Sequence, residues 1–169
     1  YDGYSDGTKG KSVKLGATKS GEDLQARFTD EEAGILTGNV YVSALVNVEA
    51  HPSGNCYVLG IVPRTKNATV GDGSNGTELG RLFIGKTDVA DEYKIGIERG
   101  GAKPVFADGT YKLGQTYLVV LRYEIDATHS GGDNVYLYVN PASFTAAPAK
   151  ADAAIDGVNW SGSSMKSQG

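Results

Sequence analysis

Two runs of alternating apolar residues in the second half of the chain constrain its fold more than any other feature. Both lie between positions 115 and 141, and a polar loop with two glycines separates them at 126–133. Apolar side chains occupy every second position of the two runs: Tyr117, Val119, Leu121, Tyr123, Ile125, Val135, Leu137 and Val139. This period predicts an antiparallel β-hairpin with one face on a core. Asn140 and Pro141 end its second strand, because proline has no amide proton for the ladder.

Shorter runs of the same kind precede the hairpin, and clusters of Gly, Asn, Asp and Pro separate them. We expect strands at 13–15, 24–28, 39–49, 56–62, 81–86 and 93–99, and a short apolar piece at 105–106. In the run 39–49, the even-numbered positions point one way and the odd-numbered positions point the other. The run 56–62 is apolar on both faces, which is typical of a central strand. After Pro141 the alternation is lost, and only Ile155, Val158 and Trp160 are expected to be buried.

This pattern predicts one all-β domain over residues 1–169. The chain holds 24 glycines in 169 residues and has no convincing helical period. Antiparallel strands with frequent turns form a two-sheet sandwich, either a jelly roll or an immunoglobulin-like fold. An immunoglobulin-like fold needs a tryptophan on an early strand, and the single tryptophan is Trp160. The jelly roll is therefore favoured.

The hairpin residues also resemble a known family. The segments 117–125 and 133–141, together with 81–86 and 21–23, are similar to concanavalin A-like (laminin G-like) jelly rolls. They resemble in particular a group found in large exported bacterial surface proteins. The resemblance implies a lectin-like sandwich, an extracellular or cell-surface location, and binding of glycans or proteins. Some members of the family bind calcium.

Composition and charge exclude several classes of function. The formal net charge is −4, with 16 basic and 20 acidic residues, so no general attraction to nucleic acid is expected. No stretch approaches the roughly 20 apolar residues of a membrane span. The single cysteine, Cys56, has no partner for an internal disulfide, and its apolar neighbours predict a buried structural thiol.

The face of the hairpin opposite the core carries the candidate binding residues. Arg122 and Glu124 of the first strand are expected to face Tyr136 and Tyr138 of the second. Two tyrosines at alternate positions present flat rings with hydroxyl tips, which suit stacking against pyranose rings. Charged neighbours add hydrogen bonds to sugar hydroxyls. The alternative is that tyrosine is simply a good strand residue and that a loop covers these rings.

An enzyme is not expected, although part of a catalytic motif is present. Related glucanases carry Glu-x-Asp-x-x-Glu, whose carboxylates serve as nucleophile and acid/base about 5 Å apart. Here Glu124 and Asp126 match the first two positions, but His129 replaces the third. Without that glutamate the proton donor is missing, so glycoside hydrolysis is the least favoured function.

No cofactor is expected either. Residues 72–78 loosely resemble a calcium loop, but the glycine spacing is wrong and Phe83 stands at the twelfth position, where a bidentate glutamate belongs. His51 and His129, the only histidines, show no metal-ligand spacing and no triad with a serine. Calcium is thus not indicated by a clear motif.

These observations lead to two principal hypotheses for function. The first is a non-catalytic binding or adhesion module of an exported bacterial protein, with a glycan or protein ligand. The second is a structural subunit of a surface layer, filament or other assembly.

The two ends of the chain carry a further expectation. Residues 1–10 and 161–169 lack the alternation that a first and a last strand need. We therefore expect the chain to be a fragment of a longer one, or to be completed by strands from a neighbouring subunit. The alternative is that 1–4 and 155–160 form short irregular substitutes.

Overall fold

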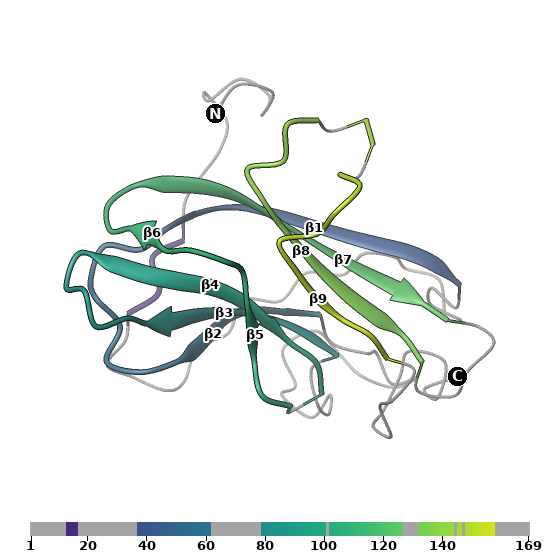
Figure 1. Cartoon of the computed structure of the whole chain (residues 1–169), viewed down its shortest axis with the longest axis horizontal. Helices are drawn as coiled ribbons and strands as arrows, with labels where there is room; N and C mark the ends of the chain where they lie inside the picture. The colour runs from purple at the N-terminus through teal and green to yellow at the C-terminus, as the bar shows by residue number, and fades with distance from the viewer. Residues whose placement is uncertain are drawn as a thin grey trace.

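The computed structural model describes residues 13–16, 37–61, 79–100, 102–126, 132–143, 145–146 and 148–157. In these residues two antiparallel sheets stack as an all-β sandwich (Figure 1). Sheet A contains, in spatial order, β1 (Gly38–Asn47), β7 (Thr116–Ile125), β8 (Asn134–Val139) and β9 (Ala153–Ile155). Sheet B contains, in spatial order, β2 (Cys56–Ile61), β3 (Gly80–Lys86), β4 (Glu92–Glu98) and β5 (Val105–Phe106), with β6 (Tyr111–Lys112) also paired to β4. The predicted two-sheet sandwich is confirmed, whereas its jelly-roll topology stays a prediction.

The long hairpin is confirmed as β7 and β8. The two strands pair antiparallel, with Leu121 opposite Leu137 and Tyr123 opposite Val135. On its other edge β7 pairs with β1, where Val42 lies opposite Leu121. Because β7 is hydrogen-bonded on both sides, it is an interior strand of sheet A. The predicted strand 39–49 and the predicted hairpin of 81–86 with 93–99 are likewise confirmed as β1, β3 and β4.

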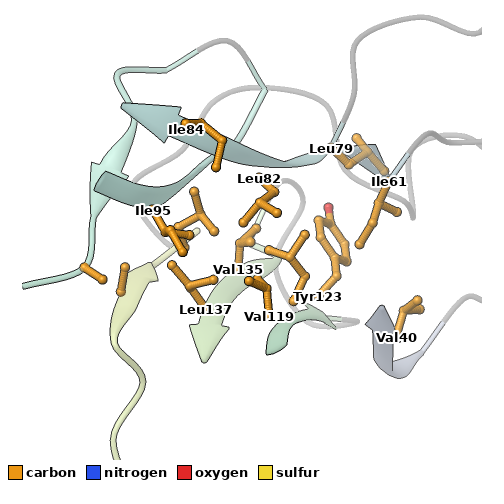
Figure 2. Close-up of a cluster of buried hydrophobic side chains, with 14 of the residues drawn as sticks. Val40, Ile61, Leu79, Leu82, Ile84, Ile95, Val119, Tyr123, Val135 and Leu137 are labelled. Carbon is orange, nitrogen blue, oxygen red and sulfur yellow. The ribbon is translucent and has the colours of Figure 1, made fainter. Parts of the chain in front are cut away.

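The core lies between the two sheets and receives side chains from both (Figure 2). Sheet A contributes mainly Val40, Val119, Leu121, Tyr123, Val135 and Leu137. Sheet B contributes mainly Leu82, Ile84, Tyr93, Ile95 and Ile97. Each of these positions alternates along its strand with one on the outer face. Full burial of such a side chain stabilises the fold by about 1.5–3 kcal/mol, so this shared layer holds the sheets together.

A buried polar contact closes the end of the β7–β8 hairpin. The Tyr123 hydroxyl donates to Oδ2 of Asp133 at 2.7 Å, and the backbone N–H of Asp126 donates to Oδ1 of Asp133 at 2.8 Å. Tyr123 and Asp133 are both fully buried. Burial and the hydrogen bond to Asp133 raise the pKa of Tyr123. Asp133 thus ties the end of β7 to the start of β8.

On the outer face of sheet B, the ring of Phe106 lies against two glycines. A Cβ atom on Gly85 would stand 2.5 Å from Cε1 of Phe106. A Cβ atom on Gly96 would stand 2.6 Å from Cδ1 of Phe106 and 2.6 Å from the carbonyl oxygen of Val105. Carbon atoms in van der Waals contact lie about 3.5–4.0 Å apart, so only glycine fits at both positions with the ring in place.

The expected strand at 13–15 is wrong. Residues 13–16 form no strand, and the side chains of Val13 and Leu15 are 59% and 57% exposed. Two alternating apolar residues form a strand only where a neighbour pairs with them and a core covers them. The predicted strand at 24–28, the loop 72–78 and most of both chain ends lie outside the described residues. No helix among the described residues is long and apolar enough to cross a membrane.

The expectation of a buried cysteine in β2 is also wrong. In the part of the chain that the structure describes, β2 lies at the end of sheet B rather than inside it. Cys56 is exposed rather than buried. The register shifts between Tyr57 and Leu59, which leaves Tyr57 exposed and packs Leu59 against the core. A bulge of this kind breaks the alternation from which burial is inferred.

Strand β9 has no counterpart in the sequence pattern. It pairs with β8, with Ala153 opposite Leu137 and Ile155 opposite Val135. Ala153 is buried, and Ile155 packs against the core as expected. Because alanine forms strands weakly, three residues containing two alanines give no signal for a strand.

Candidate functional site

The structure places the four candidate binding residues together on the outer face of sheet A. Arg122 lies opposite Tyr136 in the β7–β8 register, and Glu124 lies opposite Asn134. The guanidinium carbon of Arg122 stands 3.9 Å from the centre of the Tyr136 ring, which is a cation–π contact. Tyr138 follows two positions along β8 on the same face. Their adjacency agrees with the sequence interpretation, and their binding of sugar stays a prediction.

Hydrogen bonds fix the tip of the Tyr136 side chain. Its hydroxyl donates to Oε2 of Glu124 at 2.8 Å, and the amide of Asn134 donates to the same oxygen at 3.2 Å. Burial, together with the bond to Glu124, raises the pKa of Tyr136. Arg122 stands 4.0 Å from Glu124, at the limit of an ion pair. Tyr136 is therefore held at its ring by a cation and at its hydroxyl by a carboxylate.

The segment between β8 and β9 covers part of this face. Figure 1 shows it, in yellow-green, leaving the end of β8 and returning to β9. Asn140, at a φ of 49°, starts the turn. Its Oδ1 accepts a hydrogen bond from the backbone N–H of Leu118 at 2.8 Å, and its own backbone N–H donates to the carbonyl oxygen of Leu118 at 2.7 Å. Asp152, at the other end, accepts from the backbone N–H of Val139 at 2.7 Å. The segment is thus pinned at both ends.

This cover changes the exposure expected for the second tyrosine. Tyr138 is only 4% exposed, and Leu118 on the same face of β7 is fully buried. The alternative interpretation, in which a loop covers the rings, therefore holds for Tyr138. Tyr136 remains half-buried and reaches the surface.

Two adjacent depressions lie between sheet A and this segment. The larger, of about 500 Å³, is lined by Arg122, Tyr136, Tyr138 and residues 148–154. The smaller, of about 210 Å³, is lined by Tyr41, Ser43, Val120, Tyr138, Pro141, Ser143, Ala146 and Pro148. Tyr138 and Pro148 line both, so the two depressions form one continuous surface. We refer to it as the outer-face site.

Sequence reasoning missed most of the lining of the outer-face site, including Tyr41, Lys150 and Asp152. Tyr41, 54% exposed, lies opposite Arg122 across the β1–β7 pair, so it extends the row formed by Arg122 and Tyr136. The run 39–49 places Tyr41 on the face opposite its even-numbered positions, but only the register places it beside Arg122. Lys150 and Asp152 line the larger depression from a segment without periodicity, and no pattern signals them.

Two residues of the partial glucanase motif, Glu124 and Asp126, lie at the end of β7 and directly after it. Oε2 of Glu124 accepts bonds from Tyr136 and Asn134. Asp126 lies at the end of β7, where its backbone binds Asp133, and His129 lies outside the described residues. In the part of the chain that the structure describes, no group of three His, Cys, Asp or Glu residues is placed to hold a metal ion.

Comparison with known proteins assigns no relative to this chain. No family model matches it, no curated protein is significantly similar to it, and no solved structure matches its fold significantly. The comparisons identify no family. Of the resemblance to concanavalin A-like domains, the structure supports the two-sheet all-β sandwich. Function must therefore be argued from the outer-face site itself.

Proposed function

We propose that this chain is a non-catalytic binding module and that its outer-face site binds carbohydrate. The observation that carries the proposal is the Tyr136 ring, fixed by Arg122 at 3.9 Å and by Glu124 at 2.8 Å, at the wall of a depression of about 500 Å³. Sugars combine apolar C–H faces with a rim of hydroxyl groups. A site that combines aromatic side chains with charged hydrogen-bonding groups fits both parts of such a ligand.

The lining supports a sugar better than a purely apolar ligand. Alanine and proline side chains of residues 148–154 form one wall, whereas Lys150 and Asp152 bring charged tips to the same wall. The opposite wall is the tyrosine and arginine row of sheet A. Because Tyr136 is held at both ends, little side-chain entropy is lost when a ligand packs against it.

The proposal extends to fold family and location. The sandwich, with its long β7–β8 hairpin, supports a concanavalin A-like jelly roll, a fold in which sheet faces commonly serve binding. An exported, cell-surface bacterial protein is the setting that agrees with this family. The ligand is a glycan in the first instance, and a protein surface is the alternative occupant of the same face.

A glycan array tests the proposal. We expect the wild-type chain to bind a subset of glycans and Tyr136→Ala to lose at least about tenfold in affinity, because a stacked aromatic ring and its hydrogen bonds contribute on the order of 1.5 kcal/mol or more. The matched control is Tyr57→Ala, since Tyr57 is 49% exposed on sheet B and lies far from the site in the sheet order. Tyr57→Ala should bind like the wild type.

Two outcomes would contradict the proposal. An array without any bound glycan would remove carbohydrate as the ligand class. Binding that survives both Tyr136→Ala and Tyr138→Ala would move the binding site away from the outer face of sheet A. Circular dichroism of each variant confirms that a lost signal reflects binding rather than folding.

A structural subunit is the second candidate, and one observation favours it. Strand β1 is ten residues long, and in the described part of the chain only β7 pairs with it. Its exposed side chains include Tyr41 and Leu45. An open strand edge with apolar side chains recruits further strands from a second copy. Light scattering over a concentration series tests this candidate, and a monomer at every concentration argues against it.

A further inference from the structure

Resting on the proposed function, we propose that the outer-face site selects an acidic oligosaccharide, with a uronic acid carboxylate between Arg122 and Lys150. Both side chains line the larger depression. The inference concerns the class of sugar and its position, whereas the function proposed above requires only that some carbohydrate binds.

The guanidinium group of Arg122 retains hydrogen-bonding capacity. It stacks on the ring of Tyr136, and its Nη2 atom lies 4.0 Å from Oε2 of Glu124. That separation exceeds the length of a hydrogen bond. The guanidinium interacts with the hydroxyls of Tyr41 and Tyr136, and its buried Nε has no hydrogen-bond partner among the described residues. A planar, incompletely satisfied guanidinium matches the two oxygens of a carboxylate.

Lys150 adds a second cation to the same depression. It is exposed, and no carboxylate of the described residues forms an ion pair with it. Lys150 comes from the segment between β8 and β9, whereas Arg122 comes from β7, so the two cations approach the depression from different elements. A carboxylate between them would meet donors from both.

The nearby acidic groups are already engaged by donors of the protein. Glu124 accepts bonds from Tyr136 and Asn134 and does not line the depression. Asp152 does line it, but Oδ2 of Asp152 accepts the backbone N–H of Val139 at 2.7 Å. Arg122 and Lys150 can therefore still donate hydrogen bonds to a ligand in the depression, whereas Glu124 and Asp152 already accept hydrogen bonds from the protein.

The smaller depression sets the length of the ligand. It joins the larger one at Tyr138 and Pro148, and no charged residue lines it. The side chains in its lining that carry a polar group are Tyr41, Ser43, Tyr138 and Ser143, each with a hydroxyl. A neutral sugar unit suits this lining, so the charge of the ligand belongs at one end. The geometry thus points to a uronic acid joined to a further sugar rather than to an isolated monosaccharide.

The test compares one sugar backbone with and without its charge. Isothermal titration of the full 169-residue chain uses a galacturonic acid oligomer, the same oligomer as its methyl ester, a neutral galactose oligomer and a sulfated galactose oligomer. We expect the free acid to bind at least about tenfold more tightly than the ester, as expected for hydrogen bonds to a charged group. This preference should shrink as salt rises.

Two variants locate the charge effect. Lys150→Gln should reduce affinity for the free acid about two- to fivefold and leave the ester unchanged, because an exposed ion pair contributes modestly. The matched control is Lys94→Gln, since Lys94 is an exposed lysine on β4 of sheet B. It should change neither affinity.

Each remaining outcome has a distinct meaning. Equal binding of the acid, the ester and the neutral oligomer would overturn the acidic preference and leave carbohydrate binding intact. Tighter binding of the sulfated oligomer than of the uronate would overturn the carboxylate assignment. Binding of none of the four would overturn this inference, and a blank glycan array beside it would overturn the proposed function as well.

Discussion

The contact between Phe106 and two glycines allows a sharp test of how sheet B is packed. The test uses Gly85→Ala and Gly96→Ala, each alone and combined with Phe106→Ala. A Cβ on Gly85 would meet Phe106 at 2.5 and 2.7 Å, and otherwise only Oδ1 of Asn55 at 3.3 Å. A Cβ on Gly96 would meet Phe106 at 2.6 Å but also the backbone oxygen of Val105 at 2.6 Å. Phe106→Ala should therefore remove the clash caused by Gly85→Ala, but not the clash between Gly96→Ala and the backbone of Val105.

The magnitudes follow from these distances. Inserting a methyl group into a packed site costs about 1–3 kcal/mol. For Gly85→Ala we expect a loss of about 1 kcal/mol in the free energy of unfolding, because only the ring of Phe106 must shift. For Gly96→Ala we expect about 2–3 kcal/mol, because the backbone of β5 must shift as well. In a chain of this length each kcal/mol lowers Tm by about 2–4 °C, so the expected losses are about 2–4 °C and about 4–12 °C.

Thermal and urea denaturation of the single and double variants give the coupling energies. In the Phe106→Ala background, Gly85→Ala should cost less than about 0.5 kcal/mol, whereas Gly96→Ala should keep most of its cost. Gly54→Ala is the control, since a Cβ on Gly54 meets nothing within 4 Å. It should change stability by less than about 1 kcal/mol in either direction. Equal cost of Gly85→Ala with and without the ring would refute the reasoning.

Four further predictions concern the core, the buried polar contact, pH and catalysis. Leu121 is fully buried on β7, so Leu121→Ala should lower the free energy of unfolding, measured by urea denaturation, by about 2–5 kcal/mol. A loss below about 1 kcal/mol would contradict the central place of Leu121 in the core. Tyr123→Phe should cost about 1.5–3 kcal/mol, because it removes the donor to the buried Asp133 carboxylate. Burial, with smaller effects of Asp152 and Tyr117, raises the pKa of Tyr111 from 10.0 to about 12. The stability that Tyr111 contributes is therefore complete below pH 10 and is lost as pH rises to about 12. Alkaline denaturation of the wild type and of Tyr111→Phe checks this. Between pH 10 and about 12 the variant should lose less folding stability than the wild type. The wild-type chain should release no reducing sugar from β-glucans, and release that Glu124→Gln abolishes would establish hydrolysis instead.

The sequence by itself determined the strands that make up most of the sandwich. Apolar residues occupy every second position along one face of β1, β4, β7 and β8, and each strand lies where the pattern predicts it. In these strands the apolar face is long enough that only one register buries it, so local pattern and tertiary packing agree. The outward positions of Arg122, Glu124 and Tyr136 follow from the same alternation, which is why the candidate site residues were found.

Tertiary structure decided the features that depend on pairing between distant segments. The bulge in β2 places Tyr57 opposite Phe83 and Leu59 opposite Leu82, and no local pattern encodes this register shift. Strand β9 forms because β8 offers a free edge, although its own alanines favour strands weakly. The outer-face site likewise needs Tyr41 from β1 and Lys150 from the segment after β8, which come together only through the sheet order. Alternation specifies which face a side chain takes, but the neighbour across the sheet is fixed only when distant strands pair.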